Sequence, residues 1–438
     1  MTSPKPSGRF SIRAKIFLIA FSFSLPIGVL VYLMVDSINA NITVARMEQK
    51  GNAYMRPLEH ILERIGDDWI AAETCAPDPD ACSARRKDAS TGVTRAIEEL
   101  ARADAEYGKD LLFTGPELAK RGRQHVTVAN VSREWAELAA SKTPGREQYG
   151  HLAGDVRTMI VHAGDTSNLI LDPDLDTYYL MDATLIALPE TQDRMAQAGL
   201  DVARLLARGK STAEERIPVA VSAALLEQDR ARVMASSQTS LNEDSNFYGT
   251  SPTLERNLVP AMRAYDAAAS RLVALTRSVA DPASHITPEE YLSAVEGARK
   301  TAFSYWNVAV DELDRLLEFR AAHYRQARAR SLFLSALALL VAGLFAFALM
   351  RTIIGPLGAL IRNLGPGATL LSESVKRMSE VSRSQNMDQA EAAIICGELD
   401  AHAQDMRYAV LELARQVSGA GANEVMARAT NELVEAGS

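Results

Sequence analysis

Three aspartates stand at alternate positions in the stretch LDPDLDTYYLMD. They are Asp172, Asp174 and Asp176, and Pro173 lies among them. Proline has no amide hydrogen to donate, and the residue before it avoids the α conformation, so a helix ends here and another begins. Asp side chains accept hydrogen bonds from the free amides of a first helical turn and favour its positive dipole end. One interpretation is therefore that these aspartates cap the helix that follows.

The alternative is that the same aspartates contact a ligand or a cation. A calcium loop of the EF-hand type beginning at Asp172 would need Gly in place of Thr177 and Glu in place of Ala183, so that loop type is excluded. A ligand site built from Asp172, Asp174 and Asp176 stays open. Tyr178 could line it, although core packing is the commoner role, and Arg194 is one of several arginines that could hold an anion.

Residues for catalysis are not arranged in any recognisable pattern. The sequence has no Gly-rich phosphate loop and no Ser/His/Asp or Cys/His arrangement, and its seven histidines are not paired at metal-ligand spacing. We therefore expect no enzyme activity, no metal and no cofactor. The net charge of −8 gives no nucleic-acid footprint at the level of the whole chain.

Two long apolar segments organise the chain. Residues 16–35 and 331–350 carry no charged side chain, and about 20 helical residues cross a hydrocarbon core of roughly 30 Å. Both are predicted to be transmembrane helices. The alternative for the first is a cleaved signal peptide, but the segment is longer than a typical signal and lacks a clear Ala-x-Ala site after it.

Basic residues predict the orientation. Four of them precede the first apolar segment without any acid, which places the N-terminus in the cytoplasm, whereas Arg320 to Arg330 before the second segment argue the other way. Long loops cross largely regardless of charge, so the first segment decides. The predicted parts are a cytoplasmic N-terminus, a membrane helix, a periplasmic domain, a second membrane helix and a cytoplasmic tail: 1–15, 16–35, 36–330, 331–350 and 351–438.

The three cysteines divide between the two compartments. Cys75 and Cys82 flank the loop APDPDA on the external side, where an oxidising environment permits a disulfide. Such a bridge would pin a turn between two helices. Metal binding by the two thiolates with Asp78 and Asp80 is the rival interpretation, although no histidine is nearby. Cys396 lies in the tail and is expected to stay reduced.

Composition indicates an all-α protein, since the chain is rich in Ala, Leu, Glu and Arg and only 6% aromatic. Proline, glycine and polar stretches divide the external part into about eight helices, whose count suggests two four-helix bundles. The last helix has no proline after its first position and should run unbroken into the second apolar segment. The expected helices cover about 39–72, 84–107, 116–140, 147–171, 175–208 (with a kink or break at Pro189), 213–238 (or from Pro218), 254–280 and 288–330.

The stretch from Gly164 to Glu190, GDTSNLILDPDLDTYYLMDATLIALPE, resembles the extracytoplasmic sensor region of some bacterial methyl-accepting chemotaxis proteins, and of related sensor kinases and cyclic-dinucleotide enzymes. The resemblance implies a helical periplasmic input domain and extends over about 11–351. It specifies neither ligand nor output. The matching residues are Ser167, Asn168, Leu169, Leu171, Asp172, Pro173, Asp174, Asp176, Tyr178, Tyr179, Met181, Asp182, Leu188 and Pro189.

The tail after the second apolar segment begins like a HAMP relay module, with Ile354, Pro356, Leu357 and Leu360 in matching places, but the second half of that module is not clearly present. Apolar residues then recur at heptad spacing in two runs. They predict a helical hairpin that forms a coiled-coil homodimer, or an amphipathic hairpin without a partner.

These observations favour a membrane-bound, chemoreceptor-like sensor that detects an unidentified small periplasmic ligand in the bacterial inner membrane. Chemotaxis kinase-coupling proteins would be its partners, although the signalling tip of that family is missing from the tail. The alternative is a sensor remnant, or a regulatory or scaffold membrane protein without its own output.

Overall fold

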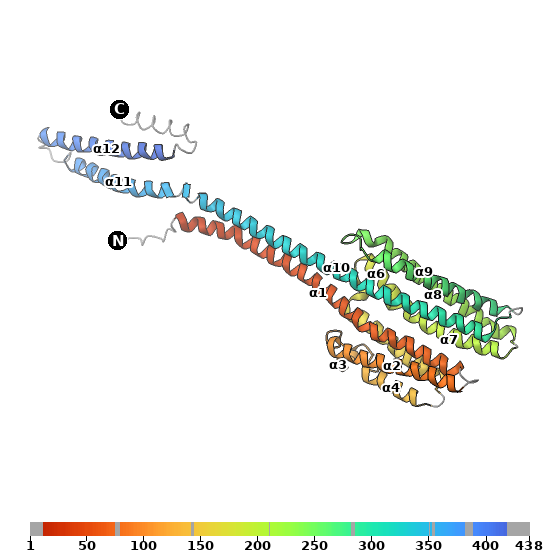
Figure 1. Ribbon diagram of the computed structural model, residues 1–438. Helices are drawn as coiled ribbons and strands as arrows, with labels where there is room; N and C mark the ends of the chain where they lie inside the picture. Colours follow the sequence, from red (N-terminus) through yellow and green to blue (C-terminus); the bar gives the residue numbers. More distant parts are fainter. Residues whose placement is uncertain are drawn as a thin grey trace. The chain divides into compact units, whose positions relative to one another are not determined.

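The computed structural model describes residues 12–74, 79–141, 144–209, 211–281, 285–349, 351–352, 355–381 and 389–417, and every regular element within them is a helix (Figure 1). The prediction of an all-α protein is thus confirmed. The chain divides into two compact units. One comprises residues 34–329, and the other comprises residues 1–33 together with 330–438.

Ten of the described α-helices contribute residues to the 34–329 unit. They are α1 (Ile12–Thr74), α2 (Pro79–Tyr107), α3 (Gly115–Lys120), α4 (Val128–Ala140), α5 (Arg146–Ser167), α6 (Leu175–Met181), α7 (Leu188–Ala207), α8 (Ala213–Glu243), α9 (Leu254–Ala280) and α10 (Pro288–Leu349). Short helical turns, Leu169–Leu171, Asp182–Ala187 and Asp244–Asn246, join some of them.

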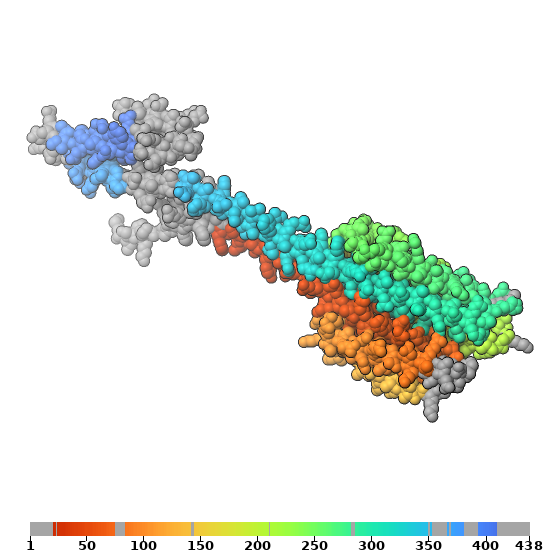
Figure 2. All heavy atoms as spheres, viewed as in Figure 1, coloured from red at the N-terminus to blue at the C-terminus, as the bar shows by residue number. Residues whose placement is uncertain are grey.

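The first and last helices of this unit lie side by side (Figure 2). Asn52 of α1 donates from Nδ2 to the carbonyl oxygen of Val310 on α10 at 3.0 Å, and Arg56 pairs with Asp311 at 2.7 Å. One continuous cluster of buried apolar side chains runs through all the larger helices of the unit. The expected division into two four-helix bundles stays a prediction.

The single helix expected over 116–140 is wrong, because two helices occupy that range. The α3 helix ends at Lys120, and Gly122 follows it with a φ of +67°, a conformation that leaves the right-handed helix. Thr127 then accepts a hydrogen bond from the amide of Asn130 at 3.2 Å and starts α4.

The kink expected at Pro189 takes the form of a wider helical turn. Residues 182–187 form a π-helical segment immediately before α7. Pro189 lacks an amide hydrogen, and its ring would clash with the carbonyl four residues earlier in a regular helix. The wider turn removes that clash.

The α8 helix begins at Ala213, so the alternative start at Pro218 is wrong. Thr212 and Glu215 form a reciprocal capping box, with the Thr212 amide donating to Glu215 at 2.9 Å and the Glu215 amide donating to Thr212 Oγ1 at 3.2 Å. The helix also continues to Glu243 instead of ending near residue 238, so the connection to the next expected helix is shorter than predicted.

The α10 helix runs without a break from Pro288 to Leu349, as predicted. Within the described residues, α1 and α10 each include a stretch long and apolar enough to cross a membrane, by length and composition. In both helices, the same continuous element supplies the apolar stretch and side chains buried in the 34–329 unit.

In the other unit, α11 (Gly355–Val381) and α12 (Gln389–Val417) pack against each other, which confirms the predicted helical hairpin. Ile395, Leu399 and Met406 on α12 are half-buried, and Met406 comes close to Gly367 on α11. Leu370, Val375 and Met378 stay exposed. Ile354 lies outside the described residues, and the HAMP resemblance and the homodimer stay predictions.

Candidate functional site

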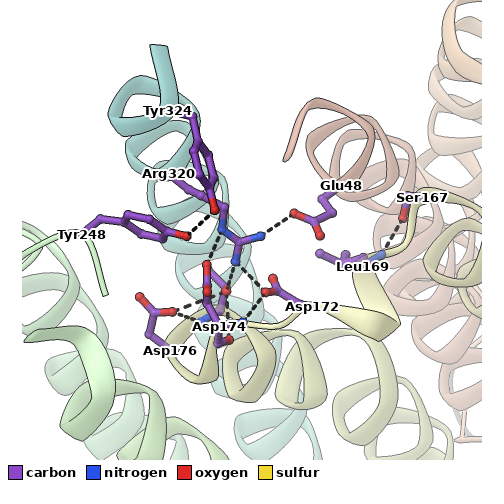
Figure 3. Close-up of polar contacts among 10 residues, drawn as sticks. Glu48, Ser167, Leu169, Asp172, Asp174, Asp176, Tyr248, Arg320 and Tyr324 are labelled. Atoms are coloured by element: carbon purple, nitrogen blue, oxygen red, sulfur yellow. Dashed lines mark hydrogen bonds and ion pairs between the residues drawn. The ribbon is translucent and has the colours of Figure 1, made fainter. Parts of the chain in front are cut away.

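A buried arginine gathers three distant segments of the 34–329 unit. Arg320 on α10 is only 3% exposed. Its Nη1 donates to Glu48 Oε2 on α1 at 2.8 Å, and its Nη2 donates to Asp172 Oδ1 and to Thr177 Oγ1, both at 2.5 Å. Its Nε lies 2.6 Å from Asp174 Oδ2 (Figure 3). We call these five residues, together with Asp176, the Arg320 cluster.

The break between α5 and α6 brings the aspartates to this arginine. Asn168 ends α5 in the left-handed conformation, with a φ of 66°, and a short turn over Leu169–Leu171 follows. Asp172 Oδ1 accepts from the amide of Asp174 at 3.0 Å, which holds the backbone around Pro173 in a tight turn. Asp172 and Asp174 therefore face α10 immediately before α6 begins, and Asp176 follows in the first turn of α6.

The capping interpretation holds only in part. Asp174 occupies the N-cap position of α6, but its side chain makes no capping hydrogen bond and faces Arg320 instead. Asp176 Oδ1 accepts from the adjacent amide of Thr177 at 2.7 Å, so this carboxylate does meet a first-turn amide.

The cluster sets four carboxyl groups against one guanidinium. Burial is the largest cause of a raised pKa for Glu48, to about 8, with Asp172 adding repulsion against the attraction of Arg320. Burial likewise raises the pKa of Asp176 to about 6 and raises that of Asp172. The pKa of Arg320 is raised as well, because its carboxylate neighbours outweigh the effect of burial. The guanidinium thus stays charged while Glu48 holds its proton at neutral pH.

Part of the hydrogen-bonding capacity of the cluster is unused. Among the described residues, Glu48 Oε1 and Asp172 Oδ2 are buried without a hydrogen-bond partner. Buried oxygens of this kind cost free energy unless they bind a proton or meet a donor. The carboxyl groups of the cluster can therefore take up or release protons. The net charge of the cluster depends on whether a proton or a hydrogen-bond donor reaches these oxygens.

Two tyrosines lie beside the cluster. The hydroxyl groups of Tyr248 and Tyr324 are 3.1 Å apart, and Figure 3 shows Tyr324 next to Arg320 on α10. Tyr248 adopts a φ of +48°, which is uncommon for a residue with a side chain, and burial raises its pKa. Tyr248 belongs to the loop before α9, so the pair connects that loop to α10 beside the cluster.

The structure brings together only some of the residues predicted as a ligand site. Asp172, Asp174 and Asp176 belong to the cluster. Tyr178 does not: its side chain is 37% exposed and meets the ring of Tyr179 edge-on. Arg194 does not either, since its Nε donates to Asp229 Oδ2 on α8 at 2.6 Å. Cys75 lies outside the described residues, as does the side chain of Cys82, so the disulfide stays a prediction.

Arg320 and Glu48 are not among the residues that the sequence predicts for the site. Arg320 stands among the basic residues that precede the second apolar segment. Its neighbours in the sequence offered a signal, because Leu313, Leu316, Leu317 and Ala321 share the buried face on which Arg320 stands. A charged residue in such an apolar stripe needs a buried partner.

No family model, curated protein or solved structure matches this chain. The function of this chain is therefore inferred from the geometry of the Arg320 cluster and from the sequence pattern around it.

Proposed function

We propose that this chain is a membrane-anchored, chemoreceptor-like sensor in which the Arg320 cluster couples an external event to a displacement between α1 and α10. The observation that carries the proposal is that the buried guanidinium of Arg320, on α10, binds both α1 and the turn over residues 172–176, which we call the DPDLD turn. Since α1 and α10 each also contain an apolar stretch, a shift between them at the cluster would be passed along continuous helices.

The proposed placement follows the sequence. Residues 36–330 would lie in the bacterial periplasm, 16–35 and 331–350 would cross the inner membrane, and 351–438 would lie in the cytoplasm. A homodimer would bury the exposed apolar residues of α11, Leu370, Val375 and Met378, and the tail would present its surface to kinase-coupling proteins. The small ligand would act by favouring one arrangement of the cluster over another.

A cysteine-labelling experiment tests the placement. Cys396 is exposed and serves as the internal probe, while a Glu147→Cys substitution adds an exposed probe on α5 in a Cys75→Ser/Cys82→Ser background. In intact cells, a membrane-impermeant maleimide should label position 147 and should reach Cys396 only after permeabilisation. Equal labelling of both positions in intact cells would refute the proposed topology.

A spin-label experiment tests the coupling without requiring the ligand. Labels at the exposed positions Thr43 on α1 and Phe319 on α10, in a chain whose cysteines are replaced by serine, report the distance between the two helices. Raising the pH from 6 to 9 ionises Glu48 and should shift the distance distribution, and Glu48→Gln should abolish that shift. A control pair at Gln238 and Glu255 on α8 and α9 should not respond.

If the 43–319 distance stays constant in the wild-type chain over this pH range, the cluster does not position α1 against α10. The contacts of Arg320 with α1 and the DPDLD turn would then have no role in signalling. A membrane-anchored scaffold or regulatory protein without its own output would be the favoured alternative.

A further inference from the structure

A second group of titratable side chains lies on α4, α5 and the loop before α4, and none of its members belongs to the Arg320 cluster. One ligand atom each from Glu134, His151 and Asp155 lies within 4.8 Å of the other two. His151 Nδ1 is 3.2 Å from Glu134 Oε2, and His125 Nε2 is 3.7 Å from Asp155 Oδ1. One imidazole and two carboxylates therefore converge, and a second imidazole, that of His125, lies beside Asp155.

Local structure positions these side chains. His151 and Asp155 are four residues apart on α5, so they project from the same face of the helix. Glu134 comes from α4, which packs against α5. The loop residue His125 is held by its own carbonyl oxygen, which accepts from Asn130 Nδ2 at 2.7 Å.

Asp155 provides an independent indication of a missing partner. The residue is 5% exposed, and its Oδ2 is buried without a hydrogen-bond partner among the described residues. Burial, followed by the nearby charge of Glu134, raises its pKa. A buried carboxylate oxygen that has no donor is stabilised by a cation.

Two of the separations between ligand atoms match those expected around a metal ion. Ligand atoms at about 2.0–2.2 Å from a tetrahedral ion are roughly 3.3–3.6 Å apart, close to the observed 3.2 and 3.7 Å. The floor of the site is buried, whereas the His125 and His151 side chains are 52% and 64% exposed, so an ion can reach it from solvent.

We propose that Glu134, His151 and Asp155 bind a divalent transition-metal ion of the Zn²⁺ type, and that His125, which lies beside Asp155, turns toward the ion as a fourth ligand. Imidazole nitrogens favour such ions over Mg²⁺ and Ca²⁺, which prefer sites made of oxygen alone. This inference goes beyond the sensor function and does not depend on it. The bound ion would cross-link α4 to α5 and fix the loop that carries His125.

The test is Zn²⁺ binding by the full-length chain in detergent micelles, with Cys75, Cys82 and Cys396 replaced by serine so that thiolates cannot contribute. After removal of metal by a chelator, competition against a chromophoric zinc chelator gives the stoichiometry and the affinity. We expect one Zn²⁺ per chain. Co²⁺ in its place should give the intense visible bands of four-coordinate cobalt bound to nitrogen and oxygen.

The variants His151→Gln and Asp155→Asn should each weaken Zn²⁺ binding at least tenfold. His151 is exposed, so its substitution tests the site even if the buried Asp155 variant fails to fold. His125→Gln should also weaken binding, and an unchanged affinity would remove His125 from the ligand set.

The matched control is His60→Gln. His60 Nδ1 lies 3.3 Å from Glu99 Oε2, a histidine–carboxylate pair of similar spacing and exposure. This variant should bind Zn²⁺ as the parent chain does. Absence of stoichiometric Zn²⁺ binding in the parent chain, or equal affinities of the His151→Gln, Asp155→Asn and His60→Gln variants, would overturn the proposal.

Discussion

Arg320 and Glu48 are joined by a hydrogen bond with an Nη1–Oε2 distance of 2.8 Å, although 272 positions separate them in the chain. Their side chains are 4% and 0% exposed. The pair joins the last helix of the 34–329 unit to the first, at the point where the DPDLD turn meets both. Removing the guanidinium and its carboxyl neighbours from water is costly, so this contact specifies one arrangement of the helices more than it adds net stability.

Replacing Arg320 with Met should destabilise the chain by about 3–5 kcal/mol, because Glu48, Asp172 and Asp174 would stay buried without their cation. Met fills a similar volume and brings no charge. Urea unfolding of the full-length chain in detergent, followed by tryptophan fluorescence, measures the change, since Trp69, Trp135 and Trp306 are buried in the same unit.

The control for this substitution is Arg325→Met on the same helix. Arg325 pairs with Glu318 at the surface, where both side chains are more than a third exposed. Exposed pairs contribute at most about 1 kcal/mol, so this variant should unfold nearly as the wild type does. Equal losses in the free energy of unfolding for the two variants would contradict the burial of Arg320 among its carboxyl partners.

Stability should fall as the pH rises through the neutral range. The pKa of Glu48 is about 8 in the native state against an ordinary value of 4.5, so the native state holds an extra proton between these limits. Its stabilising contribution is complete below about pH 4.5 and is lost as the pH approaches 8. We expect a loss of about 2 kcal/mol between pH 5.5 and 7.5 from this group.

Glu48→Gln isolates that contribution, because glutamine resembles the protonated acid and does not titrate. The free energy of unfolding of this variant should depend less steeply on pH over the same range than that of the wild-type chain. Parallel pH profiles for the two proteins would contradict the raised pKa.

The sequence predicted the helical class, the break at Pro173, an irregularity at Pro189 and the continuity of α10, because each depends on local chemistry or on composition. It did not predict the partner of the aspartates. Asp172 and Arg320 lie 148 positions apart, and only the packing of α10 against the DPDLD turn joins them. Glu48 could have been flagged, since Ala45, Asn52 and Met55 share its buried face.

Asn168 should tolerate glycine but not alanine. Its φ of 66° is the left-handed conformation, which glycine adopts freely and which costs other residues about 1–2 kcal/mol. Asn168→Ala should therefore lower the free energy of unfolding by about 1 kcal/mol, whereas Asn168→Gly should change it by less than about 0.5 kcal/mol. Thermal unfolding of both variants in detergent checks the contrast, and a neutral alanine variant would contradict the positive φ.

The α1 helix packs closely against the end of α5 at a glycine, and this makes a prediction with a matched control. A Cβ on Gly51 would lie 2.3 Å from Oγ and 2.5 Å from Cβ of Ser167, both too close for a real contact. Ser167 directly precedes the turn that leads to Asp172, so moving it away from α1 would also disturb the Arg320 cluster. Gly51→Ala should thus destabilise the chain by about 1–3 kcal/mol, although alanine favours helices.

Gly297 on α10 is the matched control. It faces open space, and there the same substitution should stabilise the chain by up to about 1 kcal/mol. Urea unfolding of both variants measures the sign of each change in the free energy of unfolding. Stabilisation by Gly51→Ala would show that α1 and α5 are not packed this closely.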